Sequence, residues 1–193
     1  MFSDVRFLVA IGILHLWIGC DHSVPAKNMA HYRNVRVQNH DSGWFPVACG
    51  LLILLNLWIA VFDGAANRSV NLTLVGTVSG GCVALVGLWL RFSAITHLGS
   101  FFTEELKVLT FQPLVKTGPY GVIRHPSYAA LLLILLGVSI TLESWWGLLY
   151  VSTVMIPIVL LRVTREERML LDAFGEAYTE YKNQTRSLIP AVF

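Results

Sequence analysis

The stretch Lys116-Thr-Gly-Pro-Tyr-Gly-Val-Ile-Arg-His-Pro-Ser-Tyr128 lies between two apolar parts of the chain and decides how the second part is built. Pro119 removes a backbone N–H donor and disfavours helical geometry at Gly118, so a helix cannot run through this point. The stretch therefore predicts a turn. Because proline is well tolerated at the first helical position, we expect a new helix to begin at Pro126.

His125 precedes that proline, which holds it extended at the start of the expected helix. A helix start presents unpaired N–H groups and a partial positive charge, and both favour a bound carboxylate or phosphate. We therefore expect this stretch to form the rim of a small-molecule pocket.

The composition predicts an integral membrane protein. Of 193 residues, 55% are hydrophobic and 13% are charged, and the mean hydropathy is +0.62. A soluble domain carries about 25% charged residues. The chain is therefore too apolar and too weakly charged for an ordinary soluble enzyme.

Four apolar runs dominate the sequence, namely Val5–Cys20, Trp44–Phe62, Val70–Leu90 and Ala129–Leu161. The last run exceeds the roughly 20 residues of one membrane span. Glu143 lies near its middle and is followed by Trp145 and Trp146, which favour the membrane interface. We therefore expect an all-α integral membrane protein with five transmembrane helices, of which helices 4 and 5 form a hairpin, and a cytosolic C-terminal helix.

The basic residues predict the orientation in the membrane. With five spans, Arg6 and Arg68 fall on one side, which leaves 12 of the 14 Lys and Arg residues on the other. Cytosolic segments carry the excess of positive charge. We therefore expect a cytosolic C terminus, in the endoplasmic reticulum if the source is eukaryotic and in the inner membrane if it is bacterial.

The first three helices contain few polar residues. Asn56 is strongly polar, and we expect it to face another helix because an amide in hydrocarbon needs a partner. The spacing of Gly76 and Gly80 allows another helix to approach closely, either within the chain or in a homodimer. The first apolar run lacks a small-residue cleavage site, so we interpret it as a retained span.

The cysteines indicate no redox or metal chemistry. Cys20, Cys49 and Cys82 match no ligand or redox spacing, and we interpret them as buried apolar cysteines.

The segments on the cytosolic side allow more than one interpretation. The loop from Asp21 to Ser42 lacks helical periodicity, and we interpret it as facing solvent or lipid headgroups. The segment from Arg91 to Lys116 has alternating apolar residues, which favour an extended or hairpin piece over the helix ends. It is either a lid on the pocket or an ordinary surface connection.

A second polar stretch follows the last apolar run. Pro157 is expected to kink helix 5 one turn before Arg162. Arg162 lies among the last apolar residues, where a charge is costly unless it pairs, snorkels or lines a cavity.

The residues after Arg162 predict a helix start. Thr164-Arg-Glu-Glu167 fits a capping box, with Thr164 as the N-cap and Glu167 as its partner, opening a helix over Met169–Tyr181. Glu166 has no such structural explanation, which makes it the better functional candidate.

These motifs resemble the isoprenylcysteine carboxyl methyltransferase family. The resemblance rests on Gln112 to Tyr128, on Arg162-x-x-x-Glu-Glu167 and on Phe174-Gly-Glu-Ala-Tyr-Thr-Glu-Tyr181. It runs from about Leu98 to Pro190, nearly half of the chain. Related phospholipid and small-thiol membrane methyltransferases share this C-terminal plan, so the resemblance identifies the cofactor and the chemistry better than the acceptor.

The resemblance implies that S-adenosylmethionine binds in a cytosol-facing pocket and that a lipidic substrate reaches it from the bilayer. Residues 1–92 would form the first three helices, and residues 93–193 the cofactor-binding part. Glu166 would hold the ammonium group, and Arg162 would orient the substrate as the catalytic residue. The other implied cofactor contacts are Gln112, Pro113, Leu114, Val115, Tyr120, His125, Pro126, Ser127 and Tyr128. Family members commonly have His where this chain has Gln112. A glutamine that contacts the cofactor in some members falls at Glu105 here, and that role is not assigned to Glu105.

The chemistry agrees with this assignment. Methyl transfer from a sulfonium needs alignment and exclusion of water, and no metal is required. The start of helix 4 can supply donors for the carboxylate of the cofactor. A carboxylate acceptor is already ionised at neutral pH and would pair with Arg162, whereas an amine or thiol would need a base, for which His97 and His125 are the nearby candidates.

Other interpretations remain open. Arg162 and Glu166 could form a simple ion pair on one helix face. Sterol reductases have a similar Arg-His-Pro-x-Tyr element, which suggests an NADPH-dependent membrane reductase, although ten spans would be expected there. A non-catalytic membrane scaffold is a third possibility. As partners we expect membrane lipids and a lipidic or prenylated substrate, and no nucleic acid.

Overall fold

The computed structural model describes residues 5–23, 37–39, 44–66, 73–102, 107–109 and 112–189. This part of the chain contains six helical bodies. They are α1 (Val5–Ser23), α2 (Trp44–Ala66), α3 (Thr73–Leu98), α4 (Pro126–Thr141), one continuous body made of α5 (Trp145–Tyr150), a π-helical turn (Val151–Met155) and α6 (Ile156–Phe174), and α7 (Glu176–Gln184). The strands β1 (Val37–Asn39) and β2 (Lys107–Leu109) pair antiparallel, with Val37 opposite Leu109.

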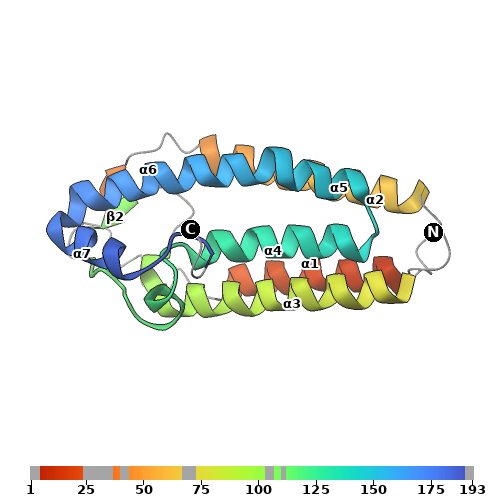
Figure 1. Ribbon diagram of the computed structural model, residues 1–193, viewed down its shortest axis with the longest axis horizontal. Coiled ribbons are helices and arrows are strands. Elements are labelled where there is room, and N and C mark those ends of the chain that lie inside the picture. Colours follow the sequence, from red (N-terminus) through yellow and green to blue (C-terminus); the bar gives the residue numbers. More distant parts are fainter. Residues whose placement is uncertain are drawn as a thin grey trace.

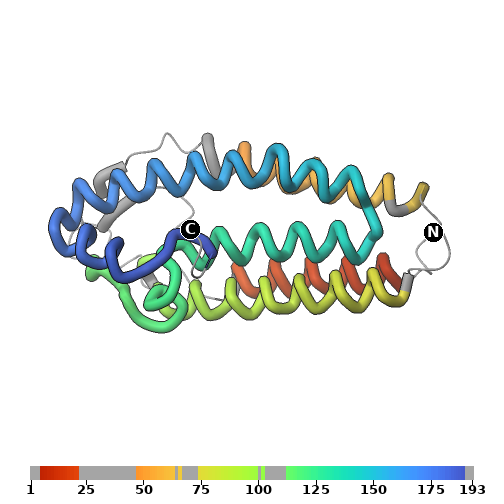
Figure 2. The backbone as a smooth tube through the Cα atoms, viewed as in Figure 1, coloured from red at the N-terminus to blue at the C-terminus, as the bar shows by residue number. Residues whose placement is uncertain are grey.

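The helices form two layers. Helices α1, α3 and α4 lie side by side in one layer, and α2 lies with α5 and α6 in the other (Figure 1). The α4–α5 turn joins the layers at one end, and the backbone tube shows α7 and the chain after it folding back at the opposite end (Figure 2). The predicted helical class is therefore confirmed.

Several helices are apolar enough for a bilayer. Two of them, Leu74–Leu98 and Trp145–Phe174, are long and apolar enough to cross a membrane, and two shorter apolar helices cover Val47–Asp63 and Pro126–Thr141. Large apolar side chains remain exposed on the outer faces of α1, α2 and α3, as they do on helices that face lipid.

Glycines bring α3 and α4 into close contact. A Cβ atom at Gly80 would lie 2.6 Å from the carbonyl oxygen of Gly137, and one at Gly137 would lie 2.5 Å from the backbone nitrogen of Ala84. No larger residue fits at such separations without moving a backbone. The glycine spacing in α3 therefore serves packing within the chain, one of its two predicted uses.

The predicted hairpin at Glu143 is confirmed. Glu143 has a φ of +54°, an unusual value for a residue other than glycine. Its Oε2 lies 3.2 Å from Nη1 of the buried Arg6 in α1, and Gly76 of α3 leaves room for its side chain. The Ser144 side chain caps α5 and donates to Asp63 at 2.8 Å. Helices α1, α2 and α3 therefore all contact this turn.

The interpretation of Asn56 is confirmed, and that of the cysteines is wrong. Asn56 is fully buried, and its Nδ2 donates to the carbonyl oxygen of Gly147 in α5 at 3.3 Å. Buried positions were expected, but Cys20 and Cys49 are half-buried and Cys82 is exposed. A cysteine tolerates a lipid-facing position because its thiol is only weakly polar.

Helix α3 is longer than the predicted run of Val70–Leu90. It begins at Thr73 and continues to Leu98, so the first third of the segment expected to be extended is helical. Its end coincides with Gly99, which has a φ of +54° and provides the left-handed residue that commonly terminates helices. An extended piece is confirmed at Lys107–Leu109, whereas residues 103–106 and 110–111, and the loop residues 24–36 and 40–43, lie outside the described part.

The predicted capping box is wrong. Helix α6 runs without interruption past Thr164, whose Oγ1 donates to the carbonyl oxygen of Leu160 at 2.9 Å, so it caps no helix start. Pro157, which was expected to kink this helix, does not end it, and a π-helical turn that closes with Ile156 N–H bonded to Val151 O directly precedes α6. The helix ends instead at Gly175, with a φ of +55°, and α7 follows in place of the predicted Met169–Tyr181 helix.

We expect the substitution Gly137→Val to destabilise the protein, because its Cβ would press into the backbone of α3. The melting temperature in detergent should fall by about 5 °C or more. Gly12→Val is the control, since a Cβ at Gly12 meets nothing within 4 Å. Equal melting temperatures of the two variants would contradict the proposed role of this contact.

Candidate functional site

The turn predicted before Pro126 is present. It contains a 3₁₀ helix, η3 (Gly118–Gly121), and Gly118 has a φ of +60°. A Cβ atom at Gly118 would overlap the ring of His97, so glycine is required there. The Tyr120 side chain is buried, and its carbonyl oxygen accepts a 2.6 Å hydrogen bond from the hydroxyl of Tyr181 in α7.

The chain after α7 pairs with the end of this turn. Arg124 N–H donates to the carbonyl oxygen of Arg186 at 2.7 Å, and His125 N–H donates to that of Ser187 at 3.1 Å. Arg186 N–H returns a bond to Val122 at 3.3 Å. The backbone that carries His125 is therefore fixed by residues about 60 positions later in the sequence.

The Arg124 side chain holds α6 and the tail together. Its Nε lies 2.9 Å from Glu167 Oε1, and its Nη1 donates to the carbonyl oxygens of Lys182 and Thr185. The Lys182 ammonium lies 2.8 Å from the other carboxylate oxygen, Glu167 Oε2. Glu167 was predicted to pair with Thr164 in a capping box. Its carboxylate instead forms ion pairs with both Arg124 and Lys182.

The start of α4 has little capacity left for an anion. Pro126 has no N–H group, and the N–H groups of Tyr128 and Ala129 both donate to the carbonyl oxygen of His125, at 3.2 and 3.1 Å. The expectation that this helix start supplies the donors for a bound carboxylate is therefore not supported, because the local turn already uses most of them.

Two charged side chains extend from α6 toward His125 and Tyr128. Arg162 is 3% exposed, and its Nε–H donates to the Tyr128 hydroxyl at 3.3 Å. Glu166, one turn later, places Oε2 3.9 Å from His125 Nδ1. Within the described part of the chain, that oxygen is buried without a hydrogen-bond partner. A buried carboxylate oxygen in this condition is costly unless a ligand compensates it.

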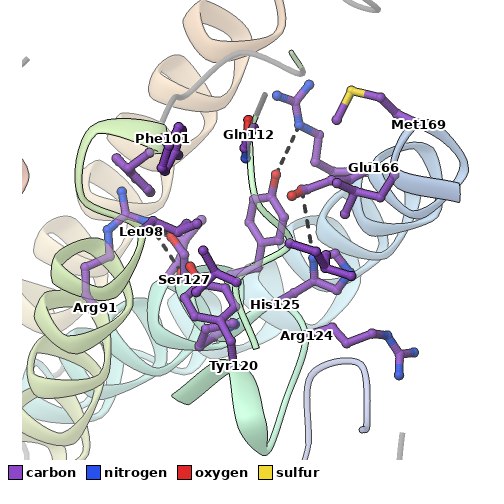
Figure 3. A pocket seen from close by; sticks show the side chains of 18 of the residues that line it. Arg91, Leu98, Phe101, Gln112, Tyr120, Arg124, His125, Ser127, Glu166 and Met169 are labelled. Atoms are coloured by element: carbon purple, nitrogen blue, oxygen red, sulfur yellow. Dashed lines mark hydrogen bonds and ion pairs between the residues drawn. The ribbon is translucent and has the colours of Figure 1, made fainter. Parts of the chain in front are cut away.

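These side chains border one cavity of about 320 Å³ between the two helical layers (Figure 3). All eleven residues predicted for the site line it, although they come from three separate stretches of sequence. They are Gln112, Pro113, Leu114, Val115, Tyr120, His125, Pro126, Ser127, Tyr128, Arg162 and Glu166.

Sequence reasoning missed Arg91 and Asp21. The Arg91 guanidinium binds both Asp21 oxygens, at 2.9 and 3.2 Å, and donates to Ser127 Oγ at 2.7 Å. Arg91 and Asp21 both line the cavity. Gly99 was the available signal, because a helix that ends there carries Arg91 inside its last two turns instead of in a loop.

The tyrosines that η3 and α7 bring to the cavity stay protonated. Burial raises the pKa of Tyr181 to about 12. Burial, together with the nearby Glu166 carboxylate, raises the pKa of Tyr120 well above its ordinary value. Both phenols are therefore hydrogen-bond donors near pH 7 rather than bases.

The cavity thus combines a carboxylate on one wall with a buried guanidinium nearby, among aromatic and aliphatic side chains. Such a site suits an elongated molecule with a cationic end and an apolar or aromatic body. Because Arg162 and His125 are almost fully buried, the part of the molecule that they contact would be shielded from water.

Curated proteins with similar sequences carry one name. Protein-S-isoprenylcysteine O-methyltransferase of Schizosaccharomyces pombe is 32% identical over 109 residues, covering 55% of this chain and 46% of that protein. Protein-S-isoprenylcysteine O-methyltransferase B of Arabidopsis thaliana is 31% identical over 110 residues (56% of each chain), and the Saccharomyces cerevisiae enzyme is 30% identical over 122 residues (62% and 51%). The chain spans about half the length of the curated relatives it matches.

A solved structure has a similar fold. It is that of the eukaryotic intramembrane Ras methyltransferase, isoprenylcysteine carboxyl methyltransferase, determined without a monobody. The TM-score is 0.62 and the sequence identity is 25%, with 79% of this chain and 54% of that chain covered. The resemblance inferred from the motifs is therefore confirmed by sequence and by fold.

Residues 75–177, which run from α3 to the first turn of α7, match the phospholipid methyltransferase family. This region holds Arg91, the turn before α4 and the two charged α6 residues predicted for the site, Arg162 and Glu166. The chain therefore belongs to the phospholipid methyltransferase family of membrane proteins.

Proposed function

We propose that the protein transfers a methyl group from S-adenosylmethionine to an acceptor that partitions into the membrane. The observation that carries this proposal is that all eleven predicted residues line the same cavity, where a buried carboxylate oxygen of Glu166 beside His125 has no hydrogen-bond partner among the described residues. Methyltransferases of this family use S-adenosylmethionine, and the residues present fit that molecule.

The fit is best at the charged end. Glu166 would hold the ammonium group of the methyl donor through a charge-assisted hydrogen bond. The residues Gln112 to Val115, with Tyr120 and His125, would enclose the rest of the molecule. When bound, S-adenosylmethionine supplies an electrophilic methyl group on a sulfonium. The chain's own task is then to align the acceptor and to exclude water.

We propose the carboxylate of a C-terminal prenylcysteine as the acceptor. The similar curated proteins are named for this reaction. Arg162 is buried and is held by the Tyr128 hydroxyl through Nε, so its guanidinium is preorganised to pair with a carboxylate.

An amine or thiol acceptor fits less well, because neither described histidine predicted as a base is well placed to act as one. His97 Nδ1 lies 2.7 Å from the carbonyl oxygen of Ser93, and His97 does not line the cavity. His125 lies between Glu166 and Glu167, and its two ring nitrogens face their carboxylate oxygens at 3.9 and 3.5 Å rather than an acceptor.

We further propose five membrane spans, made by α1, α2, α3, α4 and the continuous α5–α6 helix, with the cavity at the cytosolic side. The last of these helices has 30 residues and is about 45 Å long, whereas the hydrocarbon core is about 30 Å thick. Its final turns, which carry Glu166 and Glu167, would project into the aqueous phase. Membrane lipids and a prenylated substrate are the proposed partners, and a homodimer would need a surface other than Gly80, which packs on α4.

The first prediction from the proposed function concerns ligand choice. Purified protein in detergent should bind S-adenosylhomocysteine and not NADPH in isothermal titration. Binding of NADPH alone would favour a reductase, and binding of neither would favour a scaffold.

The second prediction concerns Glu166. The substitution Glu166→Gln should weaken S-adenosylhomocysteine binding about tenfold or more, because a charge-assisted hydrogen bond is worth about 1.5–3 kcal/mol. Glu180→Gln, on the exposed face of α7, is the matched control. If both variants bind like the unmodified protein, Glu166 does not hold the ligand.

The third prediction concerns Arg162. With N-acetyl-S-farnesylcysteine as the acceptor, Arg162→Lys should lower kcat/KM about tenfold or more, because an ammonium group cannot reproduce the forked geometry of a guanidinium. Binding of S-adenosylhomocysteine should change little. Arg165→Lys, exposed on the same helix, controls for the general effect of an Arg-to-Lys exchange on α6. Unchanged kinetics of Arg162→Lys would point to a neutral acceptor.

A further inference from the structure

The cavity extends beyond the predicted site, to a wall made by the first two helices. Trp17 and Asp21, one turn apart on α1, line it together with Cys49, Gly50 and Ile53 of α2. All five residues lie outside the region 75–177 that defines the family. This wall is therefore a part of the pocket that family membership does not specify.

An ion pair fixes α1 in this wall. Arg91 of α3 binds both carboxylate oxygens of Asp21 and also donates to Ser127 Oγ at the first turn of α4. The Phe102 ring lies 5.5 Å from the guanidinium carbon, which covers a further side of it. These contacts therefore hold α1, α3 and α4 together at the edge of the cavity.

The two sides of the cavity differ in character. Figure 3 shows Arg91, Leu98 and Phe101 on one side and Glu166 and Met169 on the other. The carboxylate expected to bind the methyl donor thus belongs to α6. The first two helices contribute mainly apolar surface, and their charged residue Asp21 is paired with Arg91.

Gly50 leaves unfilled space at this wall. It lines the cavity, and a Cβ atom built on it would meet nothing within 4 Å. Trp17 is 9% exposed and belongs to the same apolar cluster as Leu131, which also lines the cavity. The region beside Gly50 is therefore both open and apolar.

We propose that the wall formed by Trp17, Gly50, Ile53 and Leu131 binds the apolar chain of the methyl acceptor, and that Gly50 sets the length of chain that fits. This inference rests on the function proposed above and identifies the part of the pocket that selects the acceptor. An apolar wall continuous with the donor site places the chain in a dry environment while its polar end reaches Arg162. Each buried methylene should then improve binding about fourfold.

The test compares Gly50→Leu with Gly19→Leu. Gly19 lies on α1, and a Cβ there also meets nothing within 4 Å, but Gly19 does not line the cavity. Leucine is the better helix former, so both variants should fold. The measurements are KM and kcat for N-acetyl-S-farnesylcysteine and N-acetyl-S-geranylcysteine, and the Kd for S-adenosylhomocysteine.

We expect Gly50→Leu to raise KM for the 15-carbon farnesyl acceptor about tenfold or more and to change KM for the 10-carbon geranyl acceptor less than about threefold. The Kd for S-adenosylhomocysteine should stay within about twofold of the unmodified protein, and Gly19→Leu should behave like the unmodified protein. The opposite change, Ile53→Ala, makes more space at this wall. It should lower KM for a 20-carbon geranylgeranyl acceptor relative to KM for the farnesyl acceptor.

Three outcomes would overturn this inference. The first is that Gly50→Leu changes KM equally for both chain lengths, and the second is that Gly50→Leu and Gly19→Leu have equal effects on KM. The third is a protein that binds S-adenosylhomocysteine but methylates no prenylcysteine analogue, in which case the wall holds a structural lipid or another acceptor. A protein that does not bind S-adenosylhomocysteine would instead overturn the proposed function itself.

Discussion

The partly buried ion pair between Arg124 and Glu167 holds the site together. Each partner is next in sequence to a residue of the cavity, since His125 follows Arg124 and Glu166 precedes Glu167. Taking both charges out of water is costly, and the cost is offset here because Lys182 and the tail carbonyl oxygens satisfy the remaining donors and acceptors. The distance between His125 and Glu166 is thus set by the ion pair between their neighbours in sequence.

The opposite end of the molecule is fixed in a different way. There the α4–α5 turn receives one charged residue from α1, Arg6, and one from α2, Asp63, which accepts from both Ser144 Oγ and Trp146 N–H. The two helical layers are thus joined at this turn, and Arg124 joins them again at the opposite end. The cavity lies between the layers near Arg124, where the chain carries its polar residues.

The division of the cavity follows from this architecture. Helix α6 and the turn before α4 bring the polar groups proposed for the methyl donor, and both belong to the region shared with the family. Helices α1 and α2 complete the wall from outside that region, and the Asp21–Arg91 pair connects the two parts. Members of a family can in this way share one reaction while the helices outside the shared region, which complete the pocket, differ between them.

The sequence by itself determined the apolar helices, the turn at Gly118–Pro119, the hairpin at Glu143 and, through the motifs, the eleven residues that line one cavity. These features follow from local rules or from motif order, which are readable in one dimension. Only the tertiary structure decided that Glu167 pairs with Arg124 rather than capping a helix, and that Asp21 joins the pocket. Those outcomes depend on ion pairs between residues 43 and 70 positions apart, and no local pattern encodes which distant partner a buried charge will meet.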